Sequence, residues 1–418
     1  MAAVFIILFN GLSFSQLSEI LVLNEGAYDY VSNQQIEPVS VGKYDLAKGL
    51  YTKQFEIPGA RFASDIVLDG DSYWVAADRY VVQYDLTTHQ PLQQLVVTGV
   101  RKLAFHKDYL ILTRGEYLQS LGAYIQIYNK HSLQLIREIP ASTLPYTTEQ
   151  LQIKQDKAYI AVNNGFDFGK EVGQIAILDL ATLELEQVLD LGPAGKNPEN
   201  LMLKDQTIIT LNNKDFTGSS VSILDLETQS LNTYELQQVS SLCGTSTLVG
   251  SSVLYQEIGK TELGVFDLTS RSSGFFKDAG TAFYGMTFDP VSAYIVSGET
   301  NFKDFGRVHV YDQSFNEKWV FESGVTPGYF AFVQSKTVGQ EEWAAENLRI
   351  YPNPASGMLN ISVGDGLQSV QLMDAFGRVL VERGSESIDV SKLAAGSYFI
   401  RILKNDRNYV KSFVKSQD

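Results

Sequence analysis

The chain has 418 residues, 44% of them apolar, so it is long enough to bury a substantial core and to form two domains. Its 33 basic and 48 acidic residues give a formal net charge of −15, which argues against nucleic acid as a partner because phosphate backbones attract basic surfaces. Cys243 is the only cysteine, which excludes a disulfide framework and a cysteine metal cage.

Residues 1–15 have the features of a signal peptide. A short apolar stretch, Val4 to Phe9, is followed by the small residues Ser13 and Ser15 before a cut at Gln16. The stretch is too short to span a bilayer as a helix, and the alternative is a buried first strand. We therefore expect a secreted protein, and because no cysteine follows the cut, we expect no lipid anchor there.

A short phrase of two apolar residues, an aromatic or Leu, then Asp and Leu, recurs seven times. The steps between its Asp or Asn positions are 40, 44, 50, 46, 42 and 45 residues, which suits one four-stranded propeller blade per repeat. We therefore predict an all-β fold in which residues 16–336 form a seven-bladed β-propeller. The seven positions are Asp45, Asp85, Asn129, Asp179, Asp225, Asp267 and Asp312.

Each repeat is interpreted as four strands, named a to d from the axis outwards, and the phrase is strand c. Its Asp is expected to open the c-to-d turn by accepting hydrogen bonds from backbone N–H groups two residues on, so its role is architectural. The first repeat lacks strand a, whereas residues 328–333 are an extra strand a after the last repeat. Pairing the two ends would close the ring and leave no open sheet edge.

After a polar linker at residues 337–347, residues 348–418 alternate short strands with Gly turns, which predicts a small Ig-like β-sandwich. This module resembles the C-terminal sorting domain of the type IX secretion system of Bacteroidetes. The resemblance implies an address that an outer-membrane translocon reads, and a protein that is secreted or held at the cell surface. The residues that carry the sorting signal are Tyr351, Pro352, Asn353, Pro354, Gly377, Gly396 and Tyr398.

The b-to-c and d-to-a connections share one face of a propeller, and here they are the long ones, so we expect the function on this face. Aromatic faces with amides beside them suit a flat or ring-shaped polar ligand. The alternative is that the Asn residues make turns and the Phe residues pack under their own loops. The candidate ligand-binding residues are Tyr28, Tyr30, Arg61, Arg114, Tyr117, Asn163, Asn164, Phe166, Phe168, Asn212, Asn213, Phe216, Asn301, Phe302 and Tyr329.

Catalysis is the less favoured interpretation, because the four histidines are predicted away from this face and no His-plus-carboxylate cluster is expected on it. Carboxylates are predicted to end the b strand of every blade, where two or three near the axis could hold Ca²⁺ or act as an acid–base pair. They are Glu25, Asp78, Glu116, Asp167, Asp215, Glu257 and Glu299.

The opening Asn24-Glu25-Gly26, the blade count and the blade phrases resemble the seven-bladed YVTN-like surface propellers of Bacteroidetes that include vitamin B12-capturing proteins. The known capture proteins carry an N-terminal lipid-anchor cysteine that this chain lacks. The resemblance implies a cell-surface protein that captures a corrinoid or a similar cofactor, and we expect this protein to be non-catalytic and a monomer. A glycan- or protein-binding adhesin and a carboxylate-based hydrolase or lyase are the alternatives.

Overall fold

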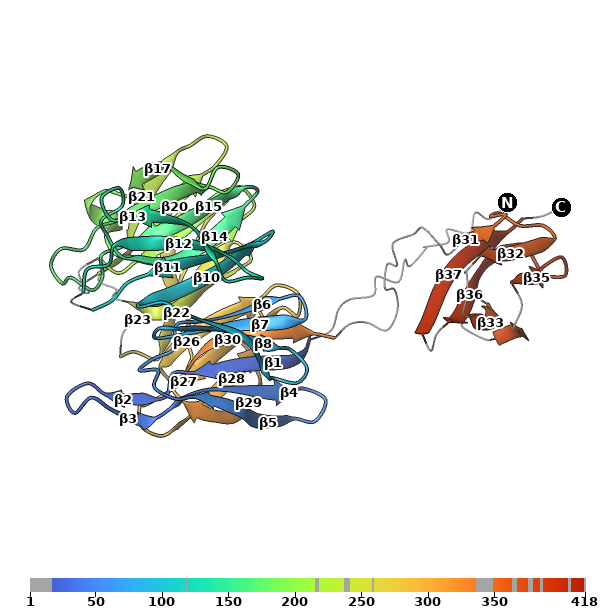
Figure 1. The fold of residues 1–418 in the computed structure, drawn as a ribbon, viewed down its shortest axis with the longest axis horizontal. Helices are drawn as coiled ribbons and strands as arrows, with labels where there is room; N and C mark the ends of the chain where they lie inside the picture. Colours follow the sequence, from blue (N-terminus) through green and yellow to red (C-terminus); the bar gives the residue numbers. More distant parts are fainter. Residues whose placement is uncertain are drawn as a thin grey trace. The chain divides into compact units, whose positions relative to one another are not determined.

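The computed structural model divides the chain into two compact units, each treated by itself, and residues 17–334 form the first (Figure 1). The structure describes residues 17–117, 119–214, 218–236, 241–257, 259–335, 349–362, 367–374, 379–383, 386–404 and 407–416. The predicted signal peptide and linker lie outside these ranges.

Seven four-stranded antiparallel sheets make up the described part of the first unit, which confirms the predicted propeller. The innermost strands, a, are β30 (Pro327–Gln334), β6 (Asp65–Asp69), β10 (Val100–His106), β14 (Thr148–Lys154), β18 (Pro198–Lys204), β22 (Ser241–Val249) and β26 (Phe283–Asp289). The b strands are β1 (Leu17–Asn24), β7 (Ser72–Ala77), β11 (Tyr109–Arg114), β15 (Lys157–Val162), β19 (Thr207–Asn212), β23 (Ser252–Glu257) and β27 (Tyr294–Glu299).

The c strands are β4 (Val39–Asp45), β8 (Tyr80–Asp85), β12 (Ala123–Asn129), β16 (Gln174–Asp179), β20 (Ser219–Asp225), β24 (Glu262–Asp267) and β28 (Phe305–Tyr311). The outermost strands, d, are β5 (Leu50–Ile57), β9 (Pro91–Val96), β13 (Leu135–Pro140), β17 (Glu184–Asp190), β21 (Leu231–Leu236), β25 (Ser272–Asp278) and β29 (Glu317–Val325). Blade one adds the hairpin of β2 (Ala27–Asp29) and β3 (Gln34–Glu37), and a short 3₁₀ helix, η1 (Pro193–Gly195), precedes β18.

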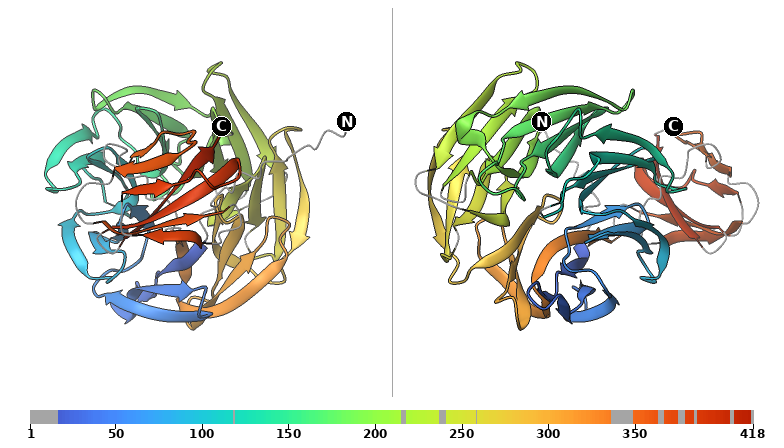
Figure 2. Two further views of the ribbon diagram at one scale, coloured as in Figure 1. Left: turned by 90° about the vertical axis from the view of Figure 1, so that its right-hand side faces the viewer. Right: turned by 60° about the vertical axis from the view of Figure 1, so that its left-hand side comes forward.

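The ring closes as predicted, because strand a of blade one comes from the far end of the unit. The first sheet has the order β30-β1-β4-β5, and Val22 pairs with Phe330. In the left view of Figure 2 the blades run around the axis from blue through green and yellow to orange, and the orange end meets the blue one. No sheet edge is left open at the junction.

The blades are held together by apolar side chains that pack between the faces of neighbouring blades. The first cluster joins Leu21 and Val41 of blade one to Tyr73 and Val75 of blade two, all of them buried. Alternation along each strand makes this possible, because every second side chain points to the neighbouring blade on one side. Each fully buried large apolar side chain contributes about 1.5–3 kcal/mol through removal from water, so the interfaces between blades stabilise the ring.

The repeated Asp has the predicted role in the turns that the structure describes. Oδ1 of Asp225 accepts hydrogen bonds from the backbone N–H groups of Glu227 (3.0 Å) and Thr228 (2.8 Å). In blade three Asn129 does the same for His131 and Ser132. An amide oxygen can therefore replace the carboxylate oxygen as the acceptor in this turn.

The second unit packs two sheets face to face, which confirms the predicted small β-sandwich. Its sheets have the orders β31-β32-β35 and β34-β33-β36-β37, and buried side chains of both, Leu359 and Ile400 among them, form one core. The strands are β31 (Arg349–Tyr351), β32 (Met358–Ser362), β33 (Leu367–Met373), β34 (Val379–Arg383), β35 (Ser387–Asp389), β36 (Gly396–Lys404) and β37 (Arg407–Lys415).

Part of the predicted sorting signal has a visible structural role. The side chain of Asn353 accepts a hydrogen bond from the backbone N–H of Val414 (2.9 Å), which ties the start of the unit to its last strand. Tyr398 stacks on Phe413, with 5.7 Å between ring centroids. Gly377 lies outside the described residues. Across the described part of the chain, no helix has the length and apolar character that crossing a membrane requires.

We predict that Asp225→Ala lowers the Tm by roughly 1–3 °C, because two turn N–H groups lose their acceptor, and that Asp225→Asn, which keeps an acceptor but loses the charge, lowers it less. The backbone N–H of Thr228, which hydrogen-bonds the carboxylate, lowers the pKa of Asp225. The contribution of the ionised Asp225 carboxylate to folding stability is therefore present above the unfolded pKa, about 4. It is lost as the pH falls through the lowered pKa of the folded state. Thermal melts of both variants between pH 2 and 7 test this, and an equal loss in the Asn variant contradicts it.

Candidate functional site

The loop face of the ring carries the b-to-c and d-to-a connections. The b-to-c connections span residues 25–38 on blade one, 115–122 on blade three and 163–173 on blade four, whereas that of blade two has only Asp78 and Arg79. On the opposite face the a-to-b turn between β6 and β7 has two residues, Gly70 and Asp71. Longer loops on one face offer more side chains to a ligand, so the search for a site starts there.

Several inner strands contain a β-bulge at the end that lies at this face. Between the pairs Val100–Arg114 and Leu103–Leu112, β10 contains one residue more than β11, so Arg101 and Lys102 both line the central cavity. Similar register shifts occur at the corresponding ends of β14, β18, β26 and β30. A bulge redirects a side chain that regular pleating would send to the other face. The shifts therefore bring extra polar side chains to one place.

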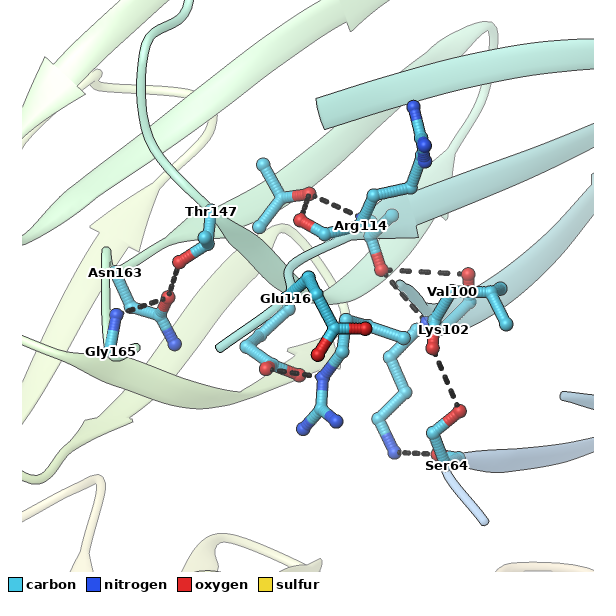
Figure 3. Close-up of polar contacts among 12 residues, drawn as sticks. Ser64, Val100, Lys102, Arg114, Glu116, Thr147, Asn163 and Gly165 are labelled. Atoms are coloured by element: carbon cyan, nitrogen blue, oxygen red, sulfur yellow. Dashed lines mark hydrogen bonds and ion pairs between the residues drawn. The ribbon is translucent and has the colours of Figure 1, made fainter. Parts of the chain in front are cut away.

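We call this place the mouth and define it by Glu25, Asp65, Arg101, Lys102, Glu149 and Glu199. Nε of Arg101 donates to Oε1 of Glu149 at 2.7 Å, and its guanidinium lies over the ring of Phe166, 5.0 Å from the centroid. Nζ of Lys102 donates to the carbonyl oxygen of Ser64 (Figure 3) and lies 4.4 Å from the ring centroid of Tyr329. Both cations are thus held by the protein's own groups.

Burial shifts the pKa values of two carboxyl groups of the mouth. Burial raises the pKa of Glu25, although the hydroxyl of Tyr284, which donates to it at 2.7 Å, and the charges of Arg101 and Lys102 oppose this shift. Burial also raises the pKa of Asp65, against the charge of Lys102. A low-dielectric mouth strengthens any ionic contact that forms inside it.

Arg61 lies beside the mouth in a fixed orientation. Its Nε and Nη2 donate to the two carboxylate oxygens of Asp78 at 2.9 and 2.6 Å, and Nη2 also donates to Glu116 at 2.8 Å. These hydrogen bonds raise the pKa of Arg61 further above its usual value, and burial opposes that shift. The two carboxylates fix the plane of the guanidinium, as bidentate pairs do.

Exposed aromatic side chains surround the mouth. They are 54% to 64% exposed, and we call them the rim: Tyr30, Tyr117, Phe168 and Phe302. Tyr117 of blade three and Phe168 of blade four are neighbours, with 6.2 Å between their ring centroids. Partial burial and the charge of Glu25, a residue of the mouth, raise the pKa of Tyr30.

Four predicted ligand-binding residues are buried, and two of them lie in strands. Arg114 ends β11, not a loop, and donates to the backbone oxygens of Thr98 and Ala123; Asn212 ends β19 and is hydrogen-bonded within its own blade. Asn163 is in its loop but accepts from Thr147 and Gly165 (Figure 3). Asn213 donates to Glu199 at 2.6 Å. The placement of Arg114 and Asn212 in loops is wrong, because both strands extend further than their alternation suggests.

The remaining candidates fall into three groups. Asn164 and Asn301 stabilise their own loops through hydrogen bonds to backbone groups. Phe166 is half-buried over Arg101 and close to Gly115, and Tyr329 lies in β30 rather than in a loop. Tyr28 lies in β2 and packs edge-on against Tyr30. Phe216 lies outside the described residues.

The predicted carboxylates form one pair at the face, Asp78 with Glu116, and Arg61 binds both. Asp167 is five residues beyond β15, so it does not end a b strand, and Asp215 lies outside the described residues. His309 was not expected to meet a carboxylate, yet its Nε2 is 2.9 Å from Glu299 and its Nδ1 is 2.8 Å from Glu317. This histidine is buried within blade seven. Among the described residues, no three His, Cys, Asp or Glu side chains are placed to hold a metal ion.

The sequence interpretation missed Asp65, Arg101, Lys102 and Glu149 as residues of the mouth. The sequence does contain a pattern that could have identified them. Two polar residues are consecutive where inner strands begin, as in Arg101-Lys102 and Glu149-Gln150. In a regular strand one of each pair would leave the cavity. Consecutive polar residues at a strand start therefore indicate a bulge.

Asn24 has a structural role at the ring junction. Its Oδ1 accepts from the backbone N–H of Gly324 in blade seven (3.0 Å), and its Nδ2 donates to the hydroxyl of Tyr51 (3.0 Å). Gly26 has φ +76, and a Cβ there would meet the carbonyl oxygen of Glu37 at 2.3 Å. In the opening Asn24-Glu25-Gly26, only Glu25 reaches the mouth.

Comparison with known proteins identifies the second unit. Residues 349–416 match the model of the secretion system C-terminal sorting domain, which confirms the type IX sorting domain. The protein is therefore exported to the cell surface or secreted, and the domain implies an interaction with the type IX machinery. No curated protein matches the chain.

Solved structures similar to the chain share its propeller fold at low identity. Hydrazine synthase of Kuenenia stuttgartiensis is 12% identical, with a TM-score of 0.53 over 68% of this chain and 97% of that one. A putative 6-phosphogluconolactonase of Bacteroides fragilis is 12% identical, with a TM-score of 0.52 over 76% and 98%. A protein of Lactobacillus plantarum is 14% identical, with a TM-score of 0.53 over 76% and 100%. At these identities the likeness shows the fold alone.

We predict that Asn24→Ala lowers the free energy of unfolding by about 1–3 kcal/mol, because buried partners in blades one and seven lose their hydrogen bonds. Chemical denaturation measures the loss. Asn232, exposed on β21, is the matched control, and its replacement by Ala is expected to change little. Equal stability of the two variants would contradict a closing role for Asn24.

Proposed function

We propose that this exported propeller is a non-catalytic binding protein that holds a large polar ligand, of the corrinoid class, across its mouth. The observation that supports it best is the rim, because exposed large aromatic side chains gathered around a charged opening are uncommon unless they bind something. Its four members come from blades one, three, four and seven. A ligand that contacts them together has to extend across several blades.

Arg61 supports the choice of a polar ligand with hydrogen-bond acceptors. Asp78 and Glu116 occupy its Nε and Nη2, so Nη1 is left to donate to a ligand, as far as the described residues go. A corrinoid carries amide side chains around a flat macrocycle, so it offers acceptors to Arg61 and apolar area to the rim. The resemblance of the blade phrases to B12-capturing propellers points to the same ligand class.

Binding is favoured over catalysis because the carboxylate pair at the face is already occupied. Asp78 and Glu116 both form ion pairs with Arg61. A hydrolase or lyase would need its acid and base free to face a substrate. Delivery by the sorting domain puts the rim outside the cell, where capture of a scarce cofactor is useful.

The test is isothermal titration of the full chain with cyanocobalamin. We expect one-to-one heat, and the double variant Tyr117→Ala/Phe168→Ala should weaken binding at least tenfold because two exposed contact faces are removed. Its Tm should stay within about 2 °C of the parent, since substitutions at exposed sites change stability little. Phe275, 70% exposed on the outer strand β25, is the matched control, and Phe275→Ala should bind normally.

Absence of heat with cyanocobalamin would remove the corrinoid as ligand. A glycan array on the same proteins would then examine the adhesin alternative, with loss of signal in the double variant assigning the glycan to the rim. Normal cyanocobalamin binding by the double variant would place the ligand elsewhere and contradict the proposed site.

A further inference from the structure

The axis of the ring contains a cavity of about 730 Å³. Its wall takes residues from the inner strands of all seven blades, so it is continuous around the axis. Ligand cavities in proteins commonly measure 300–1,000 Å³. The cavity therefore has the volume of a small-molecule site, and the rim does not contribute to its wall.

The cavity is charged at one end and uncharged at the other. Charged residues line it where the inner strands begin, at the mouth. Further along the same strands the lining residues are uncharged, and Leu203, Leu248, Met286 and Phe288 are apolar, beside the polar Gln152 and Thr287. Because strands a run from the mouth toward the a-to-b turns, this order along each strand is an order in depth. Such a cavity suits an elongated ligand with a polar head and an apolar body.

The sign of the charge at the mouth is negative. The lining residues include three acids, Asp65, Glu149 and Glu199, and two bases, Arg101 and Lys102. Glu25 adds a fourth carboxyl group, whose hydrogen-bond donor is the neutral hydroxyl of Tyr284. Acidic residues thus outnumber basic ones by two, so the mouth favours a cation over an anion when its carboxyl groups are ionised.

The two bases are already engaged. Glu149 accepts from Arg101, and the rings of Phe62 and Phe166 lie 5.7 and 5.0 Å from its guanidinium carbon. Lys102 binds the carbonyl oxygen of Ser64 and the face of Tyr329. An anionic ligand would have to displace these partners. The carboxylates also have donors, Arg101 for Glu149, Asn213 for Glu199 and Tyr284 for Glu25, but a carboxylate has further lone pairs with which it can accept from an ammonium group.

We infer that the central cavity binds a small organic cation, an amine with an apolar body, whose ammonium group lies at the mouth and whose body packs between the inner strands. This site is separate from the proposed rim function. Burial raises the pKa values of Glu25 and Asp65 against the charges of Arg101 and Lys102, and an ammonium group bound beside them would favour their ionised form.

The experiment is titration calorimetry of the full chain with three probes that share a phenyl body. They are 2-phenylethylamine, 2-phenylethanol and 3-phenylpropionate, which carry positive, neutral and negative heads. We expect one-to-one binding of the amine, with the alcohol and the acid at least tenfold weaker. Equal or tighter binding of the acid or the alcohol would overturn recognition of an ammonium group, and no binding of any probe would overturn the site.

Two substitutions test whether the amine binds within the cavity. Glu199→Gln keeps the shape of the side chain and should weaken the amine at least fivefold without affecting the alcohol, because only a charge is removed. Thr287→Trp fills space in the wall and should abolish amine binding, whereas Thr287→Val should not. Thermal melts report whether each variant folds, and unchanged binding in both Glu199→Gln and a folded Thr287→Trp would overturn the proposal.

The rim variant separates this site from the proposed function. Tyr117→Ala/Phe168→Ala should bind the amine as the parent does, even if it loses cyanocobalamin. Loss of the amine in that variant would place the probe at the rim and overturn the cavity site. Binding of the amine without any cyanocobalamin heat would leave the cavity site standing and remove the corrinoid function.

Discussion

The structure depends on one antiparallel pairing, that of β30 with β1, which turns a row of blades into a ring. Without it blade one would lack its innermost strand and both ends of the row would expose unpaired backbone groups. The pairing also positions Tyr329, which holds Lys102 at the mouth. Asn24 and Gly324 add a second connection across the same junction. The pairing that closes the ring therefore also completes the mouth.

The second constraint is crowding at the axis, where inner strands converge. Bulges at the loop-side ends of these strands place consecutive polar residues in the wall, as with Arg101 and Lys102. Side chains of neighbouring strands satisfy backbone groups displaced by the irregularity, for example Thr113, which accepts from the backbone N–H of Lys102. The result is a charged opening on a rigid frame, which suits recognition because little has to be reordered on binding.

Much of the fold could be predicted from the sequence, because the c-to-d turn repeats a local interaction that Asp225 and Asn129 both provide. Ring closure was predictable from a count of strands. The site was harder to predict from the sequence. Regular alternation along a strand would place only one of Arg101 and Lys102 in the cavity, whereas the bulge places both there. Asn212 was misplaced because β19 extends to it and its side chain is buried and hydrogen-bonded within its own blade. Exposed aromatics such as Tyr117 and Phe168 were found because they stand in loops.

The closing strand ends at Gln334, and the sorting domain begins shortly after it, at about residue 349. The last piece that the ring needs and the address for export are therefore synthesised one after the other. A chain that stops before residue 327 lacks both, so truncation before the closing strand also removes the sorting domain. The order of the two units along the chain thus couples length to export, because a polypeptide too short to close its ring also lacks the address for the type IX machinery.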